Sequence, residues 1–133
     1  MKIAICGSVQ FGKEMLEIRN ELEKNGHSVI LPQNIEQYAS GEKMVENKWD
    51  KLEGDVIRNY YHEIEKADAI LVVNKTKNNI TNYIGGNGLI EMAFAYILNK
   101  KIFLLNSIPE INYSDEISSF SPIIINGDLK LIR

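Results

Sequence analysis

The chain has 133 residues, of which 44% are hydrophobic and 25% are charged, and its formal net charge is −3. This length favours a single domain over residues 1–133, and the composition is ordinary for a globular protein. No long basic cluster is present, which argues against an extended nucleic-acid footprint. The only cysteine, Cys6, excludes an intrachain disulfide framework and a multi-cysteine metal site.

The same features favour a reducing, cytoplasmic location. The longest apolar run is too short to cross a bilayer, and Met1 leads directly into a strand-like stretch rather than a secretory leader. The two histidines lie far apart in the sequence and lack the spacing of metal ligands. We therefore expect a cytoplasmic protein with no bound metal, no cofactor, no nucleic acid and no membrane partner.

Short apolar runs alternate with segments of helical periodicity along the chain. The first half predicts a strand at Lys2–Cys6, an amphipathic helix at Gly12–Asn25 and a strand at His27–Leu31. Residues 33–54 differ, because they are polar and interrupted. We interpret them as an insertion. It is a lid, a helical excursion or a subunit contact, or it is a solvent-exposed segment without such a role. Trp49 is interpreted as its packing anchor.

The second half continues the alternation of helices and strands. Helices are predicted at Asp55–Lys66, Leu89–Asn99 and Ser114–Phe120, and strands at Ala69–Val73, Lys101–Leu105 and Pro122–Ile125. Such alternation predicts βαβ units with right-handed crossovers and a parallel sheet. We expect a flavodoxin-like or Rossmann-like three-layer α/β sandwich with strand order 2-1-3-4-5. Ligands of such sheets bind where the strand order reverses, at the loops that follow the first and third strands.

Glu91 is the only charged residue between Asn87 and Leu98, in a run that is otherwise apolar on every face. A helix of this kind is usually buried, and a carboxylate inside it is unfavourable unless it is hydrogen-bonded or used. We expect Asn87 to cap the helix through its side chain. Glu91 is then either a nucleophile that faces a ligand or an acid that accepts local backbone N–H groups.

Two glycine-bearing loops accompany this acid. The first loop, Gly7–Gly12, joins a strand to a helix. It either binds an anion through its backbone N–H groups or is an ordinary βα turn. The second leads into the Glu91 helix, where glycine lets backbone approach a ligand closely. Tyr83 beside it stacks on a base or simply packs. The candidate substrate-binding residues of both loops are Gly7, Ser8, Gln10, Phe11, Gly12, Tyr83, Gly85, Gly86, Asn87 and Gly88.

Three motifs resemble those of the nucleoside 2-deoxyribosyltransferase-like superfamily, which includes the 2′-deoxynucleoside 5′-phosphate N-hydrolases. They are Ile-Cys-Gly-Ser at Ile5–Ser8, Ile-x-x-Ala-Asp followed by a strand at Ile64–Val73, and Gly-x-x-Glu-x-x-x-Ala at Gly88–Ala95. The resemblance implies that Glu91 attacks C1′ of a nucleoside or nucleotide and displaces the base. It also implies a homodimer or a higher homo-oligomer, in which a serine or asparagine enters the neighbour's site, and Ser114 and Ser118 lie in the corresponding region of this chain.

The chain departs from this family at two places. Tyr60 stands where the family has an aspartate that orients the glutamate, and Gln10 stands where the hydrolase-type members carry an arginine. His62, two residues beyond Tyr60, either holds or protonates a reacting group or lies on a surface helix. We therefore name Glu91, Tyr60 and His62 as the candidate catalytic residues.

Two other interpretations remain. The spacing Gly-Gly-x-Gly-x-x-Glu at Gly85–Glu91 also resembles the phosphoribohydrolases that release cytokinin bases, although Ile84 and Leu89 replace their proline and threonine. Both enzyme readings predict cleavage of an N-glycosidic bond. The third interpretation is a nucleotide-binding module of the same fold that has lost catalysis together with the orienting acid.

Overall fold

Five parallel strands form one sheet in the computed structural model, which describes residues 1–43 and 55–133. Their order is β2-β1-β3-β4-β5, so the predicted fold class and strand order are confirmed. The strands are β1 (Lys2–Cys6), β2 (Ser28–Ile30), β3 (Ala69–Val72), β4 (Lys101–Leu104) and β5 (Ile123–Ile124).

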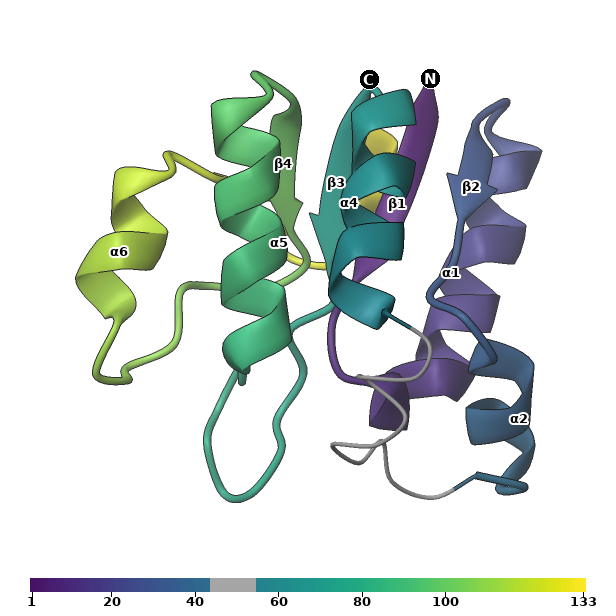
Figure 1. Cartoon of the computed structure of the whole chain (residues 1–133), viewed down its shortest axis with the longest axis horizontal. Coiled ribbons are helices and arrows are strands. Elements are labelled where there is room, and N and C mark those ends of the chain that lie inside the picture. The colour runs from purple at the N-terminus through teal and green to yellow at the C-terminus, as the bar shows by residue number, and fades with distance from the viewer. Residues whose placement is uncertain (44–54) are drawn as a thin grey trace.

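Helices cover both faces of this sheet, which gives three layers (Figure 1). One face packs against α1 (Gly12–Lys24), and the other packs against α4 (Val56–Lys66) and α5 (Gly86–Ile97). The remaining helical elements are η1 (Val9–Phe11), α2 (Ile35–Ser40), α6 (Ser114–Ser119) and η2 (Leu129–Leu131).

The two cores follow from the alternation of side chains along the central strands. In β1, Ile3 and Ile5 point toward α1, whereas Ala4 and Cys6 point toward α4 and α5. All four side chains are fully buried. Parallel strands covered on both faces are apolar throughout rather than alternating, which explains why their positions are recognisable in the sequence.

A tyrosine of α4 ties that helix to two strands. The buried Tyr60 hydroxyl donates a hydrogen bond to the main-chain oxygen of Ile5 in β1 and lies 3.4 Å from the main-chain oxygen of Ile30 in β2. These contacts fix the position of α4 over the sheet. Tyr60 therefore contributes to the packing as well as to the site described below.

Two asparagines join the loops that follow β3 and β4. The side chain of the fully buried Asn74 donates to the main-chain oxygens of Asn106 and Ser107 and accepts from the Asn106 amide at 2.9 Å. The Asn106 side chain in turn donates to the main-chain oxygen of Asn74. A buried polar network of this kind is stable because each group has a partner.

The polar segment at residues 33–54 contains helix α2 in its first part. Its last part, residues 44–54, lies outside the described residues, as does Trp49. In the described ranges of the chain, no helix is long and apolar enough to cross a membrane.

Two expectations about the Glu91 helix are wrong. Helix α5 begins at Gly86 rather than Leu89, with Gly85 as its N-cap, so Asn87 lies inside the first turn and does not cap it. The helix is also not buried on every side. It covers the sheet with Gly88, Met92 and Ala95, whereas Ile97 is 76% exposed. One layer of helix can bury only the face that it turns toward the sheet.

We expect Tyr60→Phe to lower the free energy of unfolding by about 1–2 kcal/mol, because the main-chain oxygen of Ile5 loses a buried donor. Urea titration followed by circular dichroism at neutral pH measures this change. Tyr61→Phe on the same helix is the matched control, since the ring of Tyr61 keeps its edge contact with Phe94. An equal loss in both variants would contradict the role given to the Tyr60 hydroxyl.

Candidate functional site

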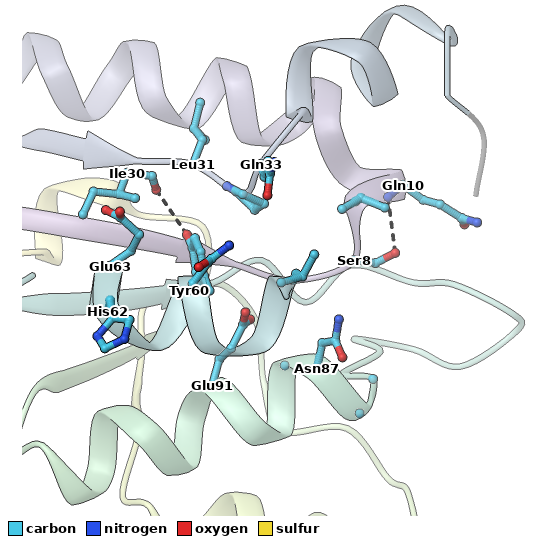
Figure 2. A pocket seen from close by; sticks show the side chains of 18 of the residues that line it. Ser8, Gln10, Ile30, Leu31, Gln33, Tyr60, His62, Glu63, Asn87 and Glu91 are labelled. Carbon is cyan, nitrogen blue, oxygen red and sulfur yellow. Dashed lines mark hydrogen bonds between the residues drawn. The ribbon is translucent and has the colours of Figure 1, made fainter. Parts of the chain in front are cut away.

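A cavity of about 810 Å³ opens at the edge of the sheet where β1 and β3 end (Figure 2). The loops that follow β1, β2 and β3 contribute to it, together with α4 and the start of α5. It is therefore the crevice at the reversal of strand order that an open α/β sheet is expected to use. Most of the candidate site residues line it, namely Gly7, Ser8, Gln10, Tyr60, His62, Tyr83, Gly85, Gly86, Asn87, Gly88 and Glu91.

The first loop needs glycine where it leaves β1. Gly7 has a φ of +141°, and a Cβ built there would lie 2.9 Å from the main-chain oxygen of Val73. Only glycine accepts both this backbone conformation and this close approach. Ser8 follows and caps η1 by accepting a hydrogen bond from the Gln10 amide at 3.3 Å. The chain thereby turns sharply and places Ser8 and Gln10 on the cavity wall.

The glycines of the second loop serve close packing at the beginning of α5. A Cβ at Gly85 would lie 2.9 Å from the Tyr83 hydroxyl, and one at Gly88 would lie 3.2 Å from the side chain of Ile84. Gly86, by contrast, faces open space and is exposed. Gly85 and Gly88 thus let Tyr83 and Ile84 fold back against the helix.

Glu91 lies in the second turn of α5 and is half-buried, and its carboxylate points into the cavity beneath Tyr60 (Figure 2). Burial raises the pKa of the Cys6 thiol, and the charge of Glu91 and a hydrogen bond with it raise that pKa further. Burial also raises the pKa of the Tyr60 hydroxyl, with smaller contributions from Cys6 and Glu91. The carboxylate therefore has two protonated neighbours at neutral pH.

His62 occupies the rim of the cavity. Its Nδ1 lies 3.4 Å from the Glu65 carboxylate, and its side chain is more than half exposed. Figure 2 shows its ring turned away from Glu91. The next cavity residue along α4, Glu63, lies 3.7 Å from the Lys66 ammonium. This end of the cavity is consequently polar and open to water.

Three candidate residues lie outside the cavity. Phe11 is buried in the core on the α1 side, and Gly12 packs closely against α2, where an added Cβ would lie 3.0 Å from the Ala39 amide. The Ser114 hydroxyl donates to the main-chain oxygen of Pro109 at 2.7 Å and accepts from the Ile111 amide at 2.9 Å. In this chain Ser114 therefore organises the start of α6.

Several cavity residues were not identified from the sequence. The loop after β2 contributes an apolar wall, and α4 contributes Val56 and Asn59 next to Tyr60. Lys77, from the loop after β3, reaches Ser8 with its ammonium 2.9 Å from the hydroxyl. Helical spacing places Val56, Asn59, Tyr60 and Glu63 on one face of α4. The sequence therefore contained a signal that could have identified them together as cavity residues.

No cluster of three or more histidine, cysteine, aspartate or glutamate side chains suited to a metal ion occurs in residues 1–43 and 55–133. The groups available for chemistry in the described part of the cavity are carboxylates, ammonium groups, amides, hydroxyls and the imidazole of His62. This set is suited to binding a polar organic molecule and to attack by a carboxylate.

The raised pKa of Cys6 predicts a thiol that is unreactive in the folded protein. At pH 8, a disulfide reagent should label native protein at least about a hundredfold more slowly than protein unfolded in urea. Because Cys6 is the only cysteine, the absorbance of the released thiolate reports on it alone. Equal rates in the two states would contradict its burial beside Glu91.

The same shift predicts a dependence of stability on alkaline pH. The unfolded chain releases the thiol proton near the ordinary value of 9.0, whereas the folded chain retains it to higher pH. The folded state then binds more protons, so the free energy of unfolding falls as pH rises above about 9. Cys6→Ala should reduce this slope in urea titrations between pH 8 and 10.

Comparisons of the chain with family models, with curated proteins and with solved structures gave no match.

Proposed function

We propose that the protein cleaves the N-glycosidic bond of a nucleoside or nucleotide, with Glu91 as the nucleophile. The observation that supports this proposal best is the direction of the Glu91 carboxylate, which points into a cavity between two glycine-bearing loops (Figure 2). A half-buried acid at the crevice of an open α/β sheet is placed where such folds bind ligands. An electrophilic carbon held there is within the reach of a carboxylate.

The proposed reaction has two steps. A Glu91 carboxylate oxygen bonds to C1′ of the sugar, while the base departs with the electron pair of the glycosidic bond and takes up a proton. Water then attacks C1′ and releases the sugar and the carboxylate, or a second base accepts the sugar. The transition state is oxocarbenium-like, as in glycoside hydrolysis with retention, and the Glu91 charge stabilises it.

The motifs support the same assignment. The chain resembles the nucleoside 2-deoxyribosyltransferase-like superfamily at Ile5–Ser8, at Ile64–Val73 and at Gly88–Ala95. These segments contain the end of β1, the end of α4 with β3, and most of α5. The first and third contribute Gly7, Ser8, Gly88 and Glu91 to the cavity, which accords with a role for them in binding.

A nucleotide-binding module without catalysis is the second candidate, and Tyr60 is the observation that favours it. Its hydroxyl donates to the main-chain oxygen of Ile5 rather than to Glu91. A tyrosine committed to the sheet does not replace an aspartate that orients a nucleophile. The cytokinin-type phosphoribohydrolase is an alternative that shares the glutamate and the preceding glycines.

Base release tests the proposal. Purified protein is incubated with ribo- and deoxyribonucleosides and their 5′-monophosphates, with and without an acceptor base, and free base is followed by chromatography. We expect release that falls more than about a thousandfold in Glu91→Ala and Glu91→Gln, because both remove the nucleophile. Glu116→Gln, an exposed acid on α6, is the control that should retain activity.

Dependence on the acceptor base would distinguish transfer from hydrolysis. Release that persists in both Glu91 variants would contradict the nucleophile. Binding of a nucleotide without any release, measured as a rise in melting temperature, would favour the binding module.

We further propose that the protein is a homodimer, as the resemblance implies. The outer surface of α4 and α5 supports this, because Ile57, Ile90, Tyr96 and Ile97 are exposed there. Exposed apolar patches of this kind are typical of association surfaces.

Light scattering after size exclusion should give a mass of twice 15.1 kDa for the wild-type chain. Ile97→Asp should shift the protein toward monomer by burying an unpaired charge in the interface. Leu131→Asp, at an exposed apolar position on η2, is the matched control and should remain dimeric. A monomeric wild-type protein would contradict the proposal.

A further inference from the structure

We infer that Tyr113 is a positioning residue that fixes the beginning of helix α5 and thereby sets where the Glu91 carboxylate lies in the cavity. The observation that carries this inference is a hydrogen bond between two loops, in which the Tyr113 hydroxyl donates to the main-chain oxygen of Ile84. Ile84 immediately precedes Gly85, the N-cap of α5. The inference rests on the proposed function only for the task that it gives to Glu91.

The beginning of α5 lacks a capping side chain. Its N-cap, Gly85, makes no side-chain hydrogen bond to the first turn, and that turn contains no acidic residue. Glycine is also the residue whose backbone is least restricted. Capping side chains and first-turn acids are the local contacts that stabilise a helix start. The position of this one therefore depends on contacts from other parts of the chain.

The residues just before α5 receive such contacts. The Ile84 side chain is buried in the core beneath α4 and α5, and an added Cβ at Gly88 would lie 3.2 Å from it. The Ile84 main-chain oxygen accepts the hydrogen bond from Tyr113. One residue earlier, the Tyr83 amide donates to the main-chain oxygen of Lys75 at 2.9 Å. The chain is thus anchored on both sides of the peptide backbone before it enters the helix.

The Tyr113 side chain extends from a segment that is itself well held. The Ile111 amide donates to the Ser114 hydroxyl at 2.9 Å, and the Ser114 amide donates to the main-chain oxygen of Ile111 at 3.0 Å. The Tyr113 ring packs against the core beneath α5. Helix α6, which follows, lies beside α5 (Figure 1), and the rings of Phe120 and Tyr96 are 5.5 Å apart. Burial raises the pKa of the Tyr113 hydroxyl, so the hydroxyl remains a donor at neutral pH.

A displacement at the start of α5 is transmitted to its acid. Glu91 lies in the second turn, six residues after Gly85. Because main-chain hydrogen bonds make a helix stiff over two turns, the carboxylate moves with the N-cap. A misplacement of about 1 Å costs a reaction about a hundredfold in rate. Tyr113 is not among the described residues that line the cavity, so it acts on Glu91 through Ile84 and the helix.

Amide hydrogen exchange followed by NMR tests the anchoring without reference to catalysis. The wild-type chain is compared with Tyr113→Phe, which keeps the ring and removes the hydroxyl. The Leu89 amide, which donates to the main-chain oxygen of the N-cap at 3.0 Å, reports on the start of α5. The Leu98 amide, which closes the last turn, reports on its end. Tyr96→Phe, at a tyrosine of the same helix that is 50% exposed, is the matched control.

Tyr113→Phe should accelerate exchange of the Leu89 amide about threefold to tenfold, which is the effect of one net hydrogen bond, and leave Leu98 unchanged. Base release should show a kcat that is about tenfold to a hundredfold lower, because the nucleophile is displaced. KM should change by less than about threefold, because the binding loop after β1 is unaltered. Tyr96→Phe should leave both exchange rates and kcat unchanged.

Unaltered exchange of Leu89 in Tyr113→Phe, or equal acceleration of Leu89 and Leu98, would overturn the inference. Faster exchange of Leu89 with an unaltered kcat would also overturn it. A wild-type protein that releases no base would instead reject the proposed function. The exchange rates would then still decide whether Tyr113 fixes the start of α5, because acceleration confined to Leu89 supports this role and unaltered exchange excludes it.

Discussion

The parallel pairing of β1 with β3 is the constraint on which the site depends. Cys6 at the end of β1 lies opposite Val72 at the end of β3, so the two strands stop at the same level. The chain leaves both strands at one edge of the sheet, which brings together loops that are about 66 residues apart in the sequence. Since β2 pairs with the other side of β1, the order reverses there and a crevice remains.

Burial of the sheet on both faces shapes the electrostatics of this crevice. Cys6 of β1 and Tyr60 of α4 lie in the apolar layer between the sheet and helices α4 and α5, where desolvation raises the pKa of each. Their neutral groups therefore lie near the Glu91 carboxylate at physiological pH. A carboxylate in such surroundings is only partly hydrated, and its charge is weakly screened because the local dielectric constant is low.

Polar side chains in the loops after β3 and β4 hold in place the loop that contributes Lys77 to the site. Asn74 and Asn106 bind each other's main chain and hold the beginning of the β3–α5 loop against the β4 loop. The hairpin at Lys77–Ile80 then directs Lys77 toward Ser8. A carboxylate from α5 and an ammonium group from this loop therefore line one cavity from different elements.

Local patterns were sufficient to predict most of the fold and part of the site. The central strands are recognisable because both of their faces are buried, and the helices are recognisable from their periodicity. The strand order also predicted that the loops containing Gly7 and Gly85 lie at the same edge of the sheet. The exposure of Ile97 could not be predicted, because whether an apolar helix is covered on its outer side depends on what else packs there.

The sequence by itself determined the parallel α/β sheet, the sheet edge at which the two glycine-bearing loops meet, and the position of Glu91 as the only charged residue between Asn87 and Leu98. These features depend on short-range spacing and on general rules of strand connection. Only the tertiary structure decided that the Tyr60 hydroxyl binds β1, that Lys77 reaches Ser8, and that Ser114 organises α6 within its own chain. Each of these contacts depends on where a side chain ends in space, which residue spacing along the chain does not fix.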